Sequence, residues 1–174
     1  GGSLLMLAGP MAAPSTYRDN PIGDLLPVNI GTGGYLNLGV NVSPEVTEDG
    51  HKSLSTSLSL APDVSARIWS HVKPMYGLPQ LAGAKSGANV LLRLPKANEA
   101  DPDYPLVAWH RYGTGKSLFV ATEDLWRMRL EVGDRFHARF WGQTIQFLTL
   151  SRLLGANKQI SIETDSNSYS AGEQ

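Results

Sequence analysis

The sequence predicts an α/β fold in which helices pack on a β-sheet. Residues 4–8 form a short, wholly apolar run of the kind that is buried on both faces of a parallel sheet. Residues 134–154 repeat apolar side chains over one broad helical face, and this face must pack on the sheet. The 174 residues are enough for one domain with a sizeable core and too few for a second full domain.

Composition narrows the possible functions. The 15 basic and 16 acidic residues leave a formal net charge of -1, so no overall field attracts nucleic acid or anionic lipid. With 0 Cys the chain has no disulfide, no thiolate metal site and no cysteine nucleophile. No apolar run approaches the ~20 residues of a membrane-spanning helix. We therefore expect neither nucleic acid nor membrane insertion, and the sequence indicates no cofactor or metal.

The first elements are a strand and a short capped helix. The strand at residues 4–8 has no charged side chain and is expected in the sheet interior rather than at an edge. Asn20 and Pro21 are typical of an N-cap and a first helical residue, and Pro27 ends this helix.

The middle of the chain is less regular. Residues 31–59 contain turn signals and little periodicity, so we expect mostly loop with a possible strand at 36–42. Residues 63–72 form a helix by periodicity, since apolar residues recur every four positions at Val64, Ile68 and Val72.

Three extended runs and a long helix complete the predicted domain. The runs cover residues 89–94, 106–112 and 117–122, and the turn at 113–116 makes the last two a β-hairpin. The helix at 134–154 ends at Gly155, and its apolar face consists of Phe136, Phe140, Trp141, Ile145, Leu148 and Leu153.

The best candidate site follows a predicted buried strand, where open α/β sheets place ligands. Its candidate binding residues, with one histidine on the long helix, are Thr122, Glu123, Asp124, Trp126, Arg127 and His137. A structural interpretation competes with this one: Thr122 or Asp124 caps the next turn, Arg127 pairs with a carboxylate, and Trp126 covers the edge of the core. Glu123 and Asp124 could perform acid/base chemistry only if their environments separate their pKa values.

Other motifs are weaker. Gly113-Thr114-Gly115-Lys116-Ser117 is similar to the end of a phosphate-binding loop, but it lacks the earlier glycine and runs into a strand instead of a helix. The four histidines have no metal-ligand spacing. Six aromatic residues could line a sugar-binding or peptide-binding groove, although core packing explains them as well: Trp109, Trp126, Trp141, Tyr17, Tyr76 and Tyr112.

Taken together, the chain resembles the C-terminal portion of a class I glutamine amidotransferase-like, flavodoxin-like domain of large bacterial envelope proteins. The stretches that carry the resemblance are residues 1–10, 21–28, 87–91 and 105–141, above all 112–116, Thr122-Glu123-Asp124-Leu125-Trp126-Arg127, 133–137 and Phe140-Trp141. The resemblance implies a three-layer sheet truncated at its N-terminal side, with the C-terminal helix packed on it. Residues 1–157 would be this domain.

In active members of that superfamily a Cys follows the buried strand, and a His-Pro-Glu sequence follows a later strand to activate it. This chain has Ala8 and Gly9 at the first place and Thr122-Glu123-Asp124 at the second. The resemblance therefore implies a degenerate nucleophile position and no glutaminase activity. The function expected is a non-catalytic binding or scaffold module. Two alternatives stay open: a hydrolase or sugar-modifying enzyme that uses the strand-end carboxylates, and a carbohydrate-binding or peptide-binding module.

The resemblance also implies a setting. It suggests a multidomain protein with this segment on the periplasmic or extracytoplasmic side of a membrane, without excluding the cytoplasm. Its missing strands would leave a sheet edge open to a second copy, as a homodimer, or to neighbouring domains of the same polypeptide. Residues 158–174 resemble a linker and the opening strand of an immunoglobulin-like β-sandwich, with a strand at 159–163.

Overall fold

The structure is a computed structural model that describes residues 2–37, 43–72, 75–96, 98, 100 and 102–155. Its strands and α-helices, in chain order, are β1 (Ser3–Leu7), α1 (Pro21–Leu25), β2 (Val28–Asn37), β3 (Glu45–Val46), α2 (Glu48–Lys52), α3 (Pro62–Ser70), β4 (Gly77–Ala84), β5 (Asn89–Arg93), β6 (Pro105–Tyr112), β7 (Gly115–Val120) and α4 (Asp134–Gly155).

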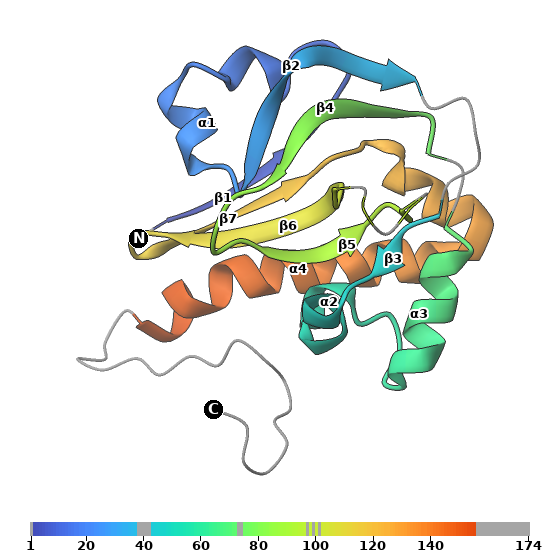
Figure 1. Cartoon of the computed structure of the whole chain (residues 1–174). Helices are drawn as coiled ribbons and strands as arrows, with labels where there is room; N and C mark the ends of the chain where they lie inside the picture. Colours follow the sequence, from blue (N-terminus) through green and yellow to red (C-terminus); the bar gives the residue numbers. More distant parts are fainter. Residues whose placement is uncertain are drawn as a thin grey trace.

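A five-stranded sheet in the order β1-β7-β6-β5-β3 forms the centre of the molecule. Strands β1 and β7 are parallel, and the other neighbouring strands of this sheet are antiparallel. Helix α4 runs along one face with α2 and α3, while α1 and a second sheet of β2 and β4 lie on the other side (Figure 1). The predicted α/β fold with a C-terminal helix packed on the sheet is therefore confirmed.

Local signals placed several elements correctly. The side chain of Asn20 accepts a hydrogen bond from the backbone N–H of Ile22 (2.9 Å), and Pro21 begins α1. Helix α3 coincides with the predicted periodic segment, although it ends at Ser70. The turn between β6 and β7 contains Gly113 with φ +59°, a left-handed conformation that glycine adopts without strain.

Strand β1 differs from the prediction in its position. It pairs with β7 on one side and lies at the edge of the sheet, so the expectation of an interior strand is wrong for this chain. Leu5 and Leu7 are 37% and 43% exposed, whereas Leu4 and Met6 pack against the core. The apolar composition of a strand indicates that its side chains are buried, but it does not identify the element that packs on them.

The stretch at 31–59, expected to be mostly loop, contains regular structure. Strand β2 extends to Asn37 and pairs with β4, a strand that the sequence pattern did not predict. The β2–β4 pairing contains register shifts, which obscure the usual alternation of apolar and polar residues. Strand β3, helix α2 and a 3-10 turn at Leu54–Thr56 follow. The predicted strand at 36–42 lies partly outside the described residues.

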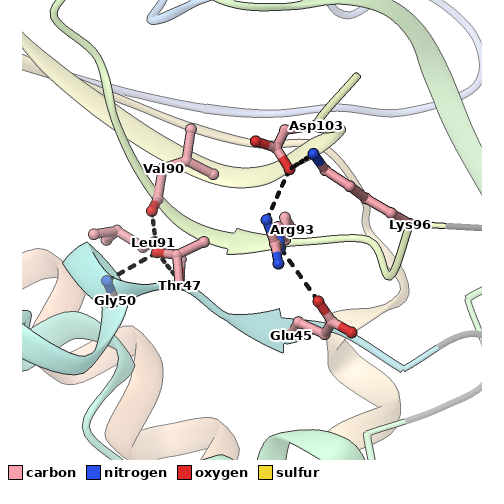
Figure 2. Close-up of polar contacts among 8 residues, drawn as sticks. All are labelled: Glu45, Thr47, Gly50, Val90, Leu91, Arg93, Lys96 and Asp103. Atoms are coloured by element: carbon pink, nitrogen blue, oxygen red, sulfur yellow. Dashed lines mark hydrogen bonds and ion pairs between the residues drawn. The ribbon is translucent and has the colours of Figure 1, made fainter. Parts of the chain in front are cut away.

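The edge of the main sheet opposite β1 is short and charged (Figure 2). Arg93 on β5 bonds Glu45 on β3 (Nε to Oε2, 3.2 Å) and Asp103 (Nη1 to Oδ1, 2.9 Å), and Lys96 also approaches Asp103 (3.4 Å). Thr47 caps α2 by accepting a hydrogen bond from the N–H of Gly50 (3.0 Å). A two-residue edge strand with ionic cover is a poor template for further strands.

The core lies between the main sheet and α4. Leu118 of β7 and Phe140 of α4 are fully buried there. Trp69 of α3 meets Phe140 edge to face with ring centroids 5.5 Å apart, and its Nε1–H donates to the carbonyl of Thr56 (2.8 Å). Ile145, which the helical pattern placed on the packed face, is instead 53% exposed.

Two expectations concern the rest of the chain. Residues 158–174, with the predicted linker and strand, lie outside the described residues, so these remain predictions. Among the described helices, none is long and apolar enough to cross a membrane.

Candidate functional site

The parallel pairing of β1 and β7 brings the ends of both strands together. The N–H of Ala8 donates to the carbonyl of Val120 (2.8 Å). A methyl group added at Gly9 would lie 3.8 Å from Oε2 of Glu123. The positions that the resemblance relates to Cys and to His-Pro-Glu are therefore neighbours in space. Between them this chain presents a buried methyl group and a glycine, neither of which is a nucleophile.

Thr122 and Asp124 form a tight polar turn after β7. The hydroxyl of Thr122, which is 1% exposed, accepts a hydrogen bond from the N–H of Asp124 (3.0 Å). The Asp124 carboxylate accepts from the backbone N–H of Tyr76 (Oδ2, 2.7 Å) and from Nε of Arg127 (Oδ1, 3.3 Å). Oδ2 thus ties the 3-10 turn at Asp124–Arg127 to the segment that precedes β4, while Oδ1 pairs with Arg127 within the turn. Arg127 pairs with a carboxylate as the structural interpretation expects, and the backbone N–H at the start of the turn is bonded by Thr122.

Arg127 lies between two exposed aromatic rings. Its guanidinium carbon is 4.5 Å from the ring centroid of Tyr76 and 4.5 Å from that of Trp126. The two aromatic residues are 47% and 45% exposed, so the group presents both rings to solvent. We call Tyr76, Trp126 and Arg127 the aromatic platform. Stacking on two rings and pairing with Asp124 fix the arginine in one position.

Tyr35 of β2 is a residue of this region that the sequence did not single out. Burial raises the pKa of its phenol to about 12, and the negative charges of Asp124 and Glu123 act in the same direction. Its ring lies against Gly77, where a side chain would overlap it. Tyr104 donates to the carbonyl of Pro79 (2.6 Å), and burial, followed by the effect of Tyr35, raises its pKa as well. No motif in the sequence marks Tyr35, which follows a glycine-rich run.

The space beside Gly9 is small. Gly9, Pro10, Gly33, Tyr35 and their neighbours line a cavity of about 50 Å³. Ligand pockets usually enclose roughly 300–1,000 Å³. This cavity is therefore too small for an amino-acid substrate next to the degenerate nucleophile position.

His137 takes part in a separate contact on α4. Its Nε2 accepts a hydrogen bond from Nε1–H of Trp141 (3.1 Å). Burial and the charge of Arg129 lower the pKa of His137, and Asp134 opposes this shift. Asp134 itself pairs with Arg129 (2.7 Å). Within the described part of the chain, no hydrogen bond or ion pair connects His137 with the strand-end carboxylates.

The hairpin at 113–116 has no features of a phosphate site. Lys116 is 4% exposed, donates to the carbonyl of Phe147 (3.2 Å) and lies 4.1 Å from the centroid of that ring. Its ammonium therefore packs against α4. A cavity of about 460 Å³ lies beside the turn, at the end of β1 and β7 away from Thr122. Among the residues that the structure describes, no cluster of His, Asp or Glu could hold a metal ion.

Comparisons with known proteins show a similarity of fold only. No protein-family model matches the chain, and no curated protein matches it. Two solved structures are similar: the cytoplasmic protein STM1381 from Salmonella typhimurium LT2 (20% identity, TM-score 0.60, 85% of this chain and 56% of that one) and the cytoplasmic protein STM3548 from Salmonella typhimurium (22%, 0.60, 85% and 55%). A β-galactosidase from Rahnella sp. R3 matches more weakly, at 16% identity and TM-score 0.41 over 20% of its length. The chain thus spans a little over half the length of the two Salmonella proteins and shares their fold.

Proposed function

We propose that this chain is a non-catalytic, amidotransferase-like module that binds a polypeptide partner through the aromatic platform. The observation that carries the first part is the approach of Gly9 to Glu123: a methyl group added at Gly9 would lie 3.8 Å from Oε2, and the position that the resemblance relates to the catalytic Cys holds Ala8 and Gly9. Covalent amide hydrolysis needs a nucleophile that a neighbouring base activates. Ala8 and Gly9 provide none.

The neighbouring polar groups support the same proposal. Thr122 is shielded from solvent and accepts a hydrogen bond from the turn, and both oxygens of Asp124 hold backbone and arginine donors. These groups maintain the shape of the strand ends. The competing proposal of a carboxylate-based hydrolase needs an acid/base pair in one cleft, and of the two strand-end carboxylates only that of Glu123 belongs to an exposed residue.

The platform has the composition of a binding surface. Trp, Tyr and Arg are the residue types that contribute most to protein–protein affinity, and here the arginine contacts one ring of each kind. Because Arg127 is already fixed by Asp124 and two rings, binding would cost little side-chain ordering. A carbohydrate would also stack on Trp126 or Tyr76, so the experiment below measures sugar binding as well as peptide binding.

The setting of the protein stays a prediction. The two similar Salmonella structures are of cytoplasmic proteins, so they offer no support for the extracytoplasmic location that the resemblance implies.

The binding proposal is tested by selecting a displayed random-peptide library on the immobilised chain. We expect enriched peptides that bind the native chain and lose at least tenfold in affinity with Trp126→Ala. Tyr112→Ala is the matched control, because Tyr112 is equally exposed (51%) on the distant hairpin. Peptides that bind Trp126→Ala as well as the native chain, or binding on a glycan array without any peptide, would count against a polypeptide partner.

A further inference from the structure

Among the strands that the structure describes, β1 is paired on one side only, by β7. β1 carries no charged residue, no proline and no bulge, which are the usual devices that protect an edge strand. The opposite edge has such protection, in the form of the two-residue β3 and the ion pairs of Arg93. The two edges of the main sheet therefore differ: β3 is short and carries ion pairs, whereas β1 has the uncharged composition of a strand that is paired on both sides.

The register shows which backbone groups are free. The N–H of Ala8 donates to Val120 of β7, and successive residues of a strand direct their backbone groups to opposite sides. Leu4, Met6 and Ala8 therefore face β7. The N–H and C=O groups of Ser3, Leu5 and Leu7 point away from it, toward the open edge.

These three residues suit a two-fold axis. If a second β1 approaches antiparallel with Leu5 opposite Leu5, then Ser3 lies opposite Leu7 at both ends. Directly opposed residues of this kind exchange both of their backbone hydrogen bonds. Every outward backbone group of β1 would then be paired by the same group of the second copy, without a gap and without like charges in contact.

The same axis covers exposed apolar side chains. The hydroxyl of Ser3 donates to the carbonyl of Leu148 on α4 (2.6 Å), so Ser3, Leu5 and Leu7 project toward the α4 face of the sheet. Ile145 lies almost one turn before Leu148 on α4. It is on the flank of the helix away from Arg139, whose side chain donates a hydrogen bond to the carbonyl of Ser57 on the other side. Since α4 runs opposite to β1 (Figure 1), Ile145 lies toward the Leu7 end.

We propose that a second copy of this chain occupies the β1 edge, with Leu5 on the two-fold axis and the two main sheets joined into one. Leu5, Leu7 and Ile145 of each copy meet below this junction. The occupant is a second copy because one symmetric register satisfies both the backbone groups and the exposed leucines, and because a wholly uncharged strand is compatible with itself. This inference is independent of the aromatic platform, which lies at the strand ends.

Light scattering after size-exclusion chromatography tests the proposal. We expect a mass of twice the 18.8 kDa of one chain, and a single-chain mass for Leu5→Lys, which would set two charges against each other. Leu60→Lys is the matched control, because Leu60 is 96% exposed and distant from β1, and it should remain dimeric.

A cysteine probe tests the register without a buried charge. The chain has 0 Cys, so Leu5→Cys introduces a single thiol, and opposed residues of this type have Cα atoms about 5.5 Å apart, close enough for a short bifunctional thiol reagent to bridge them. We expect such a reagent to link nearly all of Leu5→Cys into covalent dimers and to leave Leu60→Cys unlinked. A monomeric native chain, a Leu5→Lys chain that still dimerises, or a Leu5→Cys chain that does not link would each overturn the proposal. If a strand of another polypeptide pairs with β1 instead, the purified native chain would be monomeric.

Discussion

The carboxylate of Asp124 accepts a hydrogen bond of 2.7 Å from the backbone N–H of Tyr76, which precedes it by 48 residues. This bond ties the turn after β7 to the segment that leads into β4. It also places Tyr76 beside Arg127, so one acidic side chain positions the platform. One of the two carboxylates that the sequence offered for acid/base chemistry thus holds the strand ends together.

Asp124→Asn should therefore destabilise the protein. Only 11% of the side chain is exposed, and the substitution removes the charge that strengthens two hydrogen bonds. We expect the free energy of unfolding in urea to fall by about 1–3 kcal/mol. Asp63→Asn breaks an exposed i,i+4 pair with Arg67 and should change it by less than about 0.5 kcal/mol. Equal effects of the two substitutions would contradict the structural role of Asp124.

Tyr35 should make stability sensitive to alkaline pH. Its pKa is about 12 in the folded chain, while a tyrosine in an unfolded chain has a pKa of about 10. The unfolded state loses this proton first as pH rises, so the stabilisation is complete below about pH 10 and is lost toward pH 12. Tyr35→Phe should reduce the fall in unfolding free energy over this range, with Tyr112→Phe on the exposed hairpin as control. An identical pH dependence in native and Tyr35→Phe chains would be the contrary result.

Gly77 should tolerate no side chain. A Cβ there would overlap the ring of Tyr35, whereas nothing lies within 4 Å of a Cβ at Gly34. We expect Gly77→Ala to lower the unfolding free energy by about 1–3 kcal/mol and Gly34→Ala to leave it nearly unchanged. Thermal unfolding followed by circular dichroism measures both. If Gly34→Ala were the more damaging change, the packing of Tyr35 on Gly77 would be wrong.

The tryptophans should separate into core and surface residues. Trp69 is fully buried and hydrogen-bonded, so Trp69→Phe should cost about 1–3 kcal/mol through the lost hydrogen bond to Thr56, to which Ser65 still donates, and through altered packing. Trp126 is 45% exposed, and Trp126→Phe should cost less than about 1 kcal/mol. Urea unfolding of the two variants provides the comparison, and the reverse order would contradict the role of Trp126 in an exposed platform.

Local sequence signals predicted the elements whose causes are local. The cap at Asn20, the hairpin turn at Gly113 and the long helix from Asp134 each depend on residues within a few positions of one another. Strand β2 escaped prediction because its glycines and register shifts hide the alternating pattern, and its partner β4 lies some 40 residues away in the chain.

The candidate site was predictable only in part. The order of Thr122, Glu123 and Asp124 after an apolar strand indicated the end of β7 as a candidate region, and the parallel pairing of β1 with β7 brings Ala8 and Gly9 beside it. Tyr35 and the bond to Tyr76 depend on tertiary contacts between distant segments, which no spacing in the sequence records. His137 lies on the predicted helix, but its contact is with Trp141.

Ammonia released from L-glutamine by the purified chain is the measurement that decides whether the module is non-catalytic. We expect no release above a protein-free blank, because Ala8 and Gly9 provide no nucleophile and Asp124 is held by Tyr76 and Arg127. Release that rises in proportion to the chain and disappears in Glu123→Gln would contradict the proposed function.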